Sequence, residues 1–166
     1  MAKNKKYMSI QELLSIRIEN NNKNSKLKGK AKEFYFTNML KDDLKDILKE
    51  IGYKVVRITK EFKMFKGICD FICELENKEY LIIECKVSSD NKYESNDLRF
   101  SFAIGQLLTY RTSLALSYEV PKEKIHLMLI TDDDSLFTLS VIGFEELNID
   151  YLVYKNGGVK YYDYKK

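Results

Sequence analysis

Proline, glycine and cysteine are all scarce in this sequence of 166 residues. One proline and seven glycines exclude collagen-like chains and Pro/Gly-rich disordered chains, which depend on both residues. Three cysteines cannot all pair with one another, so a disulfide-stapled miniprotein is disfavoured. No stretch approaches 18 uncharged apolar residues, and the lysine-rich start is not followed by an apolar segment with a small-residue cleavage site. We therefore expect an intracellular, cytoplasmic protein without a membrane partner.

The composition that remains is that of a globular protein. Hydrophobic residues make up 45% and charged residues 32%, which is ordinary for a chain with one packed core. The length predicts a single domain, because two separate cores would each be marginal. Cys69, Cys73 and Cys85 all lie in apolar, strand-like runs, so we expect buried, reduced thiols rather than a zinc or iron–sulfur site.

Positive charge is concentrated at the N-terminus. Residues 1–32 contain eight lysines and Arg17 against Glu12 and Glu19, a net charge of +7 that leaves −4 for the rest of the chain. Residues 1–26 are expected to form a basic arm with a short amphipathic helix, and residues 27–166 the globular domain. Such an arm suits a polyanion such as nucleic acid, although a solvated N-terminus explains the charge equally well.

Hydrophobic spacing predicts an α/β fold. Apolar residues recur every three or four positions from about Leu27 to Ile51, and Gly52 follows where a helix cap belongs. The other expected elements are strands at 53–59, 67–75, 79–87, 125–131 and 136–142, a helix at 98–118, and a tyrosine-rich tail at 151–164 that forms a hairpin at Gly157-Gly158. A helix that joins two strands favours a parallel pair, so we expect a mixed central sheet flanked by helices.

Two carboxylates and a lysine are expected to share one face of this sheet. If the hairpin between the second and third strands is centred on Asn77, Asp70 lies opposite Glu84. Lys86 is two residues further along and projects beside Glu84. Opposed acids in an apolar strand repel each other unless a cation lies between them, and oxygen ligands suit Mg²⁺, with Mn²⁺ as an alternative. The simpler interpretation is a Glu–Lys pair with an unrelated aspartate.

The helix at 98–118 carries a polar and aromatic stripe. Arg99, Phe102, Gln106 and Tyr110 fall at three- and four-residue spacing on an otherwise apolar helix. Gln106 and Tyr110 therefore need partners, either a water or phosphate at the metal site or backbone groups nearby.

The order of elements and these residues together resemble the PD-(D/E)XK nuclease superfamily. That family has a restriction-endonuclease-like αβββαβ core with an aspartate followed by Glu-x-Lys on adjacent strands. The match covers about residues 27–131, and Cys69 stands where the family name has proline. The Gln-x-x-x-Tyr pattern of Gln106 and Tyr110 is similar to that of the RecB-like branch.

The resemblance implies a role for each of these residues. Asp70, Glu84 and the Cys85 carbonyl would be metal ligands, with Glu33 of the first helix as a further candidate. Lys86 would be the catalytic lysine, and Gln106 and Tyr110 would position water or phosphate. The expected phosphate contacts are Lys30, Lys66 and Arg99.

The resulting hypothesis is a Mg²⁺-dependent deoxyribonuclease that hydrolyses phosphodiester bonds through a metal-activated water. DNA is the expected partner, and a homodimer is left open. The alternatives are an inactive nuclease-fold module that binds nucleic acid or assembles with other proteins, and a small structural protein with a chance motif. Asp132–Asp134 are interpreted as a solvated turn, and His126 lies in an apolar strand without a nucleophile motif. The tail tyrosines fit base stacking, a sheet edge or a dimer interface.

Overall fold

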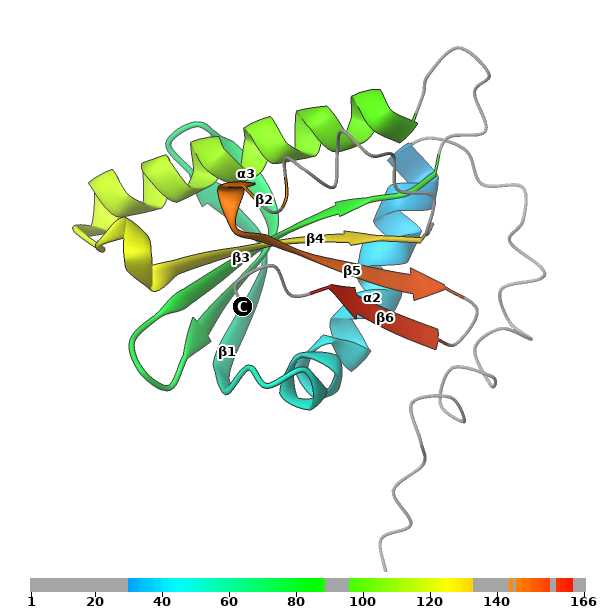
Figure 1. Ribbon diagram of the computed structural model, residues 1–166, viewed down its shortest axis with the longest axis horizontal. Coiled ribbons are helices and arrows are strands. Elements are labelled where there is room, and N and C mark those ends of the chain that lie inside the picture. The colour runs from blue at the N-terminus through cyan, green and yellow to red at the C-terminus, as the bar shows by residue number, and fades with distance from the viewer. Residues whose placement is uncertain (1–29, 89–95, 133–143, 145, 156–157, 163–166) are drawn as a thin grey trace, which may run out of the picture.

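A six-stranded sheet with a helix on each face forms the described part of the molecule (Figure 1). The computed structural model describes residues 30–88, 96–132, 144, 146–155 and 158–162. Its elements are α2 (Lys30–Glu50), β1 (Val55–Met64), β2 (Gly67–Leu75), β3 (Tyr80–Lys86), α3 (Asn96–Tyr118), the short 3₁₀ helix η1 (Lys122–Lys124), β4 (Ile125–Thr131), β5 (Ile149–Lys155) and β6 (Gly158–Tyr162).

The sheet is mixed, as predicted. Its strand order is β1-β2-β3-β4-β5-β6. The β1/β2, β2/β3 and β5/β6 pairs are antiparallel, whereas β3/β4 and β4/β5 are parallel. The parallel β3/β4 pair follows from the α3 crossover, since a strand can return in the same direction only after a long connection. From α2 to β4 the order is the expected αβββαβ core, and β5 and β6 extend the sheet.

The two helices bury opposite faces of the sheet (Figure 1). One core contains Leu40, Leu44 and Leu48 of α2, which recur every fourth residue and are fully buried against alternate residues of the strands. The other core contains Phe100 and Leu107 of α3. Burial of each such side chain contributes about 1.5–3 kcal/mol, so both faces are anchored.

Helix α2 ends at a glycine cap, as the sequence predicts. Gly52 has φ of +99°, a left-handed conformation that favours glycine. The Gly52 N–H donates to the Lys49 carbonyl at 3.1 Å, and the Tyr53 N–H donates to the Leu48 carbonyl at 2.8 Å. These two bonds form a Schellman motif, which satisfies carbonyls at the end of the helix and turns the chain toward β1.

The β2–β3 hairpin has the predicted register. Phe71 pairs with Ile83 and Ile72 with Ile82, so the hairpin is centred on Asn77. The first strand is longer than predicted, because β1 continues through charged residues to Met64. β1 is an edge strand, where charged side chains reach solvent without interrupting the backbone pairing.

The C-terminal tail differs in part from the prediction. It forms the β5/β6 hairpin, but Gly158 is the first residue of β6 and pairs with Lys155, so the turn precedes it. Tyr151 and Tyr154 are buried in the two cores, so they pack the fold and cannot stack on bases. The expected arm at residues 1–26 and strand at 136–142 lie outside the described residues. Neither described helix is long and apolar enough to span a bilayer.

Candidate active site

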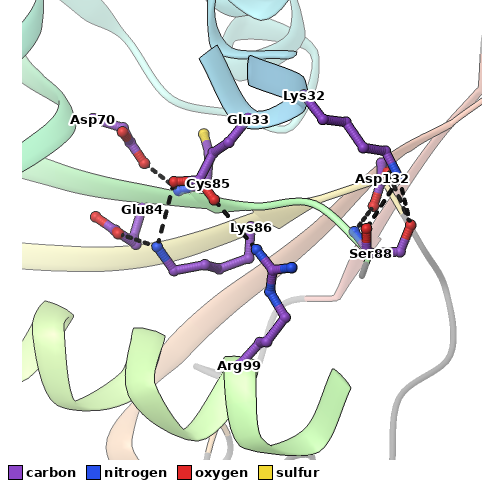
Figure 2. Close-up of polar contacts among 9 residues, drawn as sticks. All are labelled: Lys32, Glu33, Asp70, Glu84, Cys85, Lys86, Ser88, Arg99 and Asp132. Atoms are coloured by element: carbon purple, nitrogen blue, oxygen red, sulfur yellow. Dashed lines mark hydrogen bonds and ion pairs between the residues drawn. The ribbon is translucent and has the colours of Figure 1, made fainter. Parts of the chain in front are cut away.

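Glu84 and Lys86 project from β3 on the side of the sheet that α3 covers. Their neighbours Ile83, Cys85 and Val87 point to the α2 core, and side chains alternate along a strand. Glu84 is only 3% exposed, and the Lys86 ammonium donates to Glu84 Oε1 at 2.6 Å. The lysine is therefore held against a buried carboxylate (Figure 2).

Asp70 lies beside this pair on the neighbouring strand β2. The β2/β3 pairing ends with Phe71 and Ile83, and Asp70 and Glu84 are the next residue beyond that pair on each strand. The backbone N–H of Cys85 donates to Asp70 Oδ2 at 2.7 Å, so this carboxylate lies against the β3 backbone between Glu84 and Lys86 (Figure 2). The Cys85 side chain itself is fully buried on the opposite face.

Burial disfavours negative charge on both acids, and repulsion by Asp70 adds to this effect at Glu84. Burial raises the pKa of Asp70 to about 6, against the opposing effects of the Cys85 N–H and Lys86. Burial and then repulsion by Asp70 raise the pKa of Glu84 to about 7. Burial by itself would lower the pKa of Lys86, but attraction to Glu84 and Glu33 outweighs it, and the pKa is raised. The single positive charge of Lys86 therefore does not fully neutralise the negative charge of these acids.

The donor set fits a hard divalent cation. Glu84 Oε2 is buried and has no hydrogen-bond partner in the described part of the chain, which leaves a carboxylate oxygen open to a ligand. Mg²⁺ commonly binds through one or two carboxylates and completes its shell with water and substrate phosphates. The described residues contain no group of three or more acidic, histidine or cysteine side chains that could hold a metal alone. Asp70, Glu84 and a backbone carbonyl with water would suffice.

Glu33 and Arg99 bring both helices to the site (Figure 2). Glu33 lies in the first turn of α2, with Oε1 at 3.8 Å from the Lys86 ammonium. Its Oε2 is 3.5 Å from Nη2 of Arg99, which comes from the first part of α3. Glu33, the further candidate ligand, therefore lies between two cations beside the acids. Arg99, an expected phosphate contact, is paired with this carboxylate.

Gln106 and Tyr110 lie on the α3 side of the site. The Tyr110 hydroxyl donates to the Ile68 carbonyl of β2 at 2.9 Å, and Gln106 Nε2 donates to that hydroxyl at 3.4 Å. Burial and then the charge of Glu84 raise the pKa of Tyr110, which places the phenol in the field of the acids. Gly67 permits this close approach, because a Cβ there would lie 3.2 Å from the Tyr110 ring.

Asp132 is a residue that the sequence interpretation assigned wrongly to a solvated turn. Its carboxylate accepts the Ser88 N–H at 2.5 Å and the Ser88 hydroxyl at 3.1 Å. Lys32 of α2 lies 3.4 Å from the same carboxylate and donates to the Ser88 carbonyl at 3.0 Å (Figure 2). This Lys32–Ser88–Asp132 cluster joins the ends of β3 and β4 to α2 beside the acids.

The remaining candidates lie further from the acids. Lys30 is exposed at the start of α2, and Lys66 is exposed in the turn between β1 and β2. His126 is bonded to Glu79 at 2.5 Å and borders a separate pocket with Tyr53, outside the acidic site. All three cysteines are free and buried, as predicted.

Comparison with solved structures identifies the fold. A repair endonuclease from Pyrococcus abyssi matches with a TM-score of 0.51 and 17% identity over 80% of this chain and 50% of that one. A structure of an EndoMS–dsDNA complex matches with a TM-score of 0.50 and 18% identity over 75% of this chain and 44% of that one. This chain spans about half the length of these two structures or less. No protein-family model and no curated protein matches the sequence.

The described domain therefore has a restriction-endonuclease-like fold, as the sequence motifs implied. The acidic pair and Lys86 lie on adjacent central strands of that fold, between the first turn of α2 and the face of α3 (Figure 2).

Proposed function

We propose that this protein is a metal-dependent nuclease that hydrolyses phosphodiester bonds in DNA. One observation carries the proposal: the Asp70 carboxylate accepts the Cys85 N–H, directly beside Glu84 and its bonded Lys86 ammonium, on adjacent strands of a restriction-endonuclease-like fold. The two neighbours whose names describe a repair endonuclease and a complex with double-stranded DNA support this choice of substrate. Residues 27–166 would form the nuclease domain, with residues 1–26 as a basic arm.

Each side chain has a task in this proposal. Asp70, Glu84 and the Cys85 carbonyl would hold Mg²⁺ or Mn²⁺, with Glu33 as a further candidate ligand. When bound, the ion supplies an activated water and neutralises charge on the phosphate. Lys86 would orient the nucleophile or stabilise negative charge that develops on the phosphate oxygens. Buried, reduced cysteines suit an intracellular setting, where DNA is available.

The helices would hold the substrate and the acids in place. Gln106 and Tyr110 would position water or phosphate beside Glu84, while the Tyr110 bond to Ile68 ties α3 to β2. Lys30 and Lys66 are exposed and would track the phosphate backbone. Arg99 is paired with Glu33, so it would reach a phosphate only by sharing or exchanging that partner.

A cleavage assay tests the proposal. Labelled single-stranded, duplex and four-way-junction DNA would be incubated with the purified protein in Mg²⁺, Mn²⁺ or EDTA. We expect metal-dependent cleavage that falls at least about 100-fold in Glu84→Gln and in Lys86→Ala, as for loss of a group that stabilises the transition state. Glu76→Gln and Lys54→Ala are matched controls, because both side chains are mostly exposed.

Two results would contradict the proposed nuclease function. Undiminished cleavage by Glu84→Gln would remove the assigned site. Binding without cleavage of any of these DNAs, in any of the metals, would instead support an inactive nuclease-fold module.

A further inference from the structure

A groove lies directly beside the proposed catalytic residues and is not filled by the protein. It has a volume of about 570 Å³ and runs between the β1–β2 turn and one face of α3. Its lining includes Tyr110, Gln106 and Phe102 of α3 and Lys66 of the turn. Tyr110 donates to the Ile68 carbonyl, two residues before Asp70 on β2, so the groove opens next to the acids rather than on a remote surface.

One exposed phenylalanine lines this groove, and another is next in sequence to the lining residue Lys66. Phe102, which lines it, is 63% exposed, and Phe65, which precedes Lys66 in the turn, is 81% exposed. Large aromatic side chains exposed together mark binding surfaces, because leaving them in water is unfavourable. The Lys66 ammonium lies 5.2 Å from the centre of the Phe65 ring, so a positive charge accompanies the aromatic surface.

The glycine at position 105 favours a ligand from outside the chain in this groove. It lies inside α3, where glycine weakens a helix relative to alanine. A Cβ at Gly105 would meet nothing within 4 Å, so no internal contact requires the glycine. Gly105 instead leaves room on the helix surface that lines the groove, next to Phe102 and Gln106.

We propose that this groove binds unpaired nucleotides of the nucleic-acid substrate, with bases stacked on Phe102 and Phe65 and a phosphate at Lys66. This inference rests on the proposed nuclease function and names its substrate class. A base exposes its flat face to an aromatic ring only when it is not stacked in a duplex, and adjacent cations neutralise its phosphate. The preferred substrates are therefore single strands, flaps or mismatched sites rather than fully paired DNA.

The absence of tryptophan from this chain permits a direct test. Phe102→Trp and, separately, Phe65→Trp place a sole indole at the groove, where a stacked base quenches its fluorescence. Leu116→Trp is the control, since Leu116 is 78% exposed near the other end of α3 and does not line the groove. Full-length variants would be titrated with oligothymidylate and with a blunt duplex of equal length, in EDTA to prevent cleavage.

We expect oligothymidylate to quench both groove indoles, the duplex to quench them weakly, and neither to quench the Leu116→Trp control. Phe102→Leu should weaken oligothymidylate binding roughly 5-fold to 100-fold, the usual effect of losing one base–aromatic stack. Lys66→Gln should reduce the slope of log affinity against log salt by about 0.7, as for loss of one phosphate contact, whereas Phe102→Leu leaves this slope unchanged.

Gly105→Leu separates a blocked groove from a misfolded protein. The added side chain meets no protein atom at its Cβ and favours the helix, so the variant should be at least as stable as the parent. It should nevertheless lose oligothymidylate binding, because leucine fills the groove. Normal binding by Gly105→Leu, equal quenching of the Leu116→Trp control, or stronger quenching by the duplex would each overturn the proposal.

These readouts do not depend on catalysis. Quenching without cleavage in any metal would support the groove and contradict the nuclease. Metal-dependent cleavage of duplex DNA without quenching by oligothymidylate would support the nuclease and contradict the groove.

Discussion

Asp70 carries an electrostatic cost in the metal-free protein. Its pKa is about 6 in the folded state, above the ordinary value of 3.8, chiefly because the carboxyl is buried. A raised carboxyl pKa means that the folded state disfavours the charge. The resulting loss of stability therefore develops as the pH rises from about 4 to about 6 and is fully present at pH 8.

Asp70→Asn should consequently stabilise the metal-free protein. We expect the free energy of unfolding at pH 8, measured with urea in EDTA, to rise by about 1–3 kcal/mol, because asparagine can still accept the Cys85 N–H without burying a charge. Mg²⁺ should raise the melting temperature of the parent but not that of the variant. A variant less stable than the parent in EDTA would show that the acid is stabilised without metal.

At the scale of elements, the Lys32–Ser88–Asp132 cluster connects three segments that are distant in sequence. Ser88 and Asp132 are 44 residues apart and follow β3 and β4, while Lys32 belongs to α2. The adjacent helix residue Glu33 reaches Lys86. The cluster therefore holds the start of α2 where Glu33 meets Lys86 of β3.

Removing the Asp132 carboxylate should loosen this junction. Asp132→Ala removes the acceptor of the Ser88 N–H and the carboxylate that pairs with the Lys32 ammonium, so we expect the free energy of unfolding to fall by about 1–3 kcal/mol. Urea unfolding beside Glu123→Ala, an exposed acid in η1, would measure the difference. An effect no larger than that of Glu123→Ala would return Asp132 to the role of a solvated turn residue.

At the scale of the whole molecule, a buried thiol and a phenol that stay protonated in the folded state make the free energy of unfolding decrease at alkaline pH. Burial raises the pKa of the Cys73 thiol to about 12 from an ordinary 9.0. Burial and the carboxylate of Asp150, to which its hydroxyl donates, raise the pKa of Tyr53 well above its ordinary range. The unfolded chain releases these protons earlier, so the stability they contribute is complete below about pH 9 and is lost as the pH rises toward 12.

Unfolding at several alkaline pH values tests this expectation. Between pH 9 and 12, ionisation of Cys73 in the unfolded chain should by itself lower the free energy of unfolding by about 1 kcal/mol per pH unit. Cys73→Ala should be less stable at pH 8, because it leaves a cavity, but should lose less stability between pH 8 and pH 10. Parallel pH profiles for the parent and Cys73→Ala would contradict the assignment.

Local patterns in the sequence account for much of the fold. The bounds of β2 and β4, the glycine cap of α2 and the hairpin centred on Asn77 all follow from residues close together in the chain. The extent of β1 does not, because charged residues such as Lys60 and Glu61 belong to a strand only when that strand lies at a sheet edge. Likewise, two tail tyrosines pack cores whose other members are far away in the sequence.

The sequence by itself determined the αβββαβ order and the register of the β2–β3 hairpin, because helix periodicity, strand alternation and a short hairpin are local properties. Only the tertiary structure decided that Asp132 binds Ser88 and Lys32, that Arg99 pairs with Glu33, and that a groove lined by the exposed Phe102 opens beside Tyr110. These features depend on segments that are brought together when the helices pack on the sheet. The partner of a side chain in such a contact is distant in sequence, so local periodicity does not predict it.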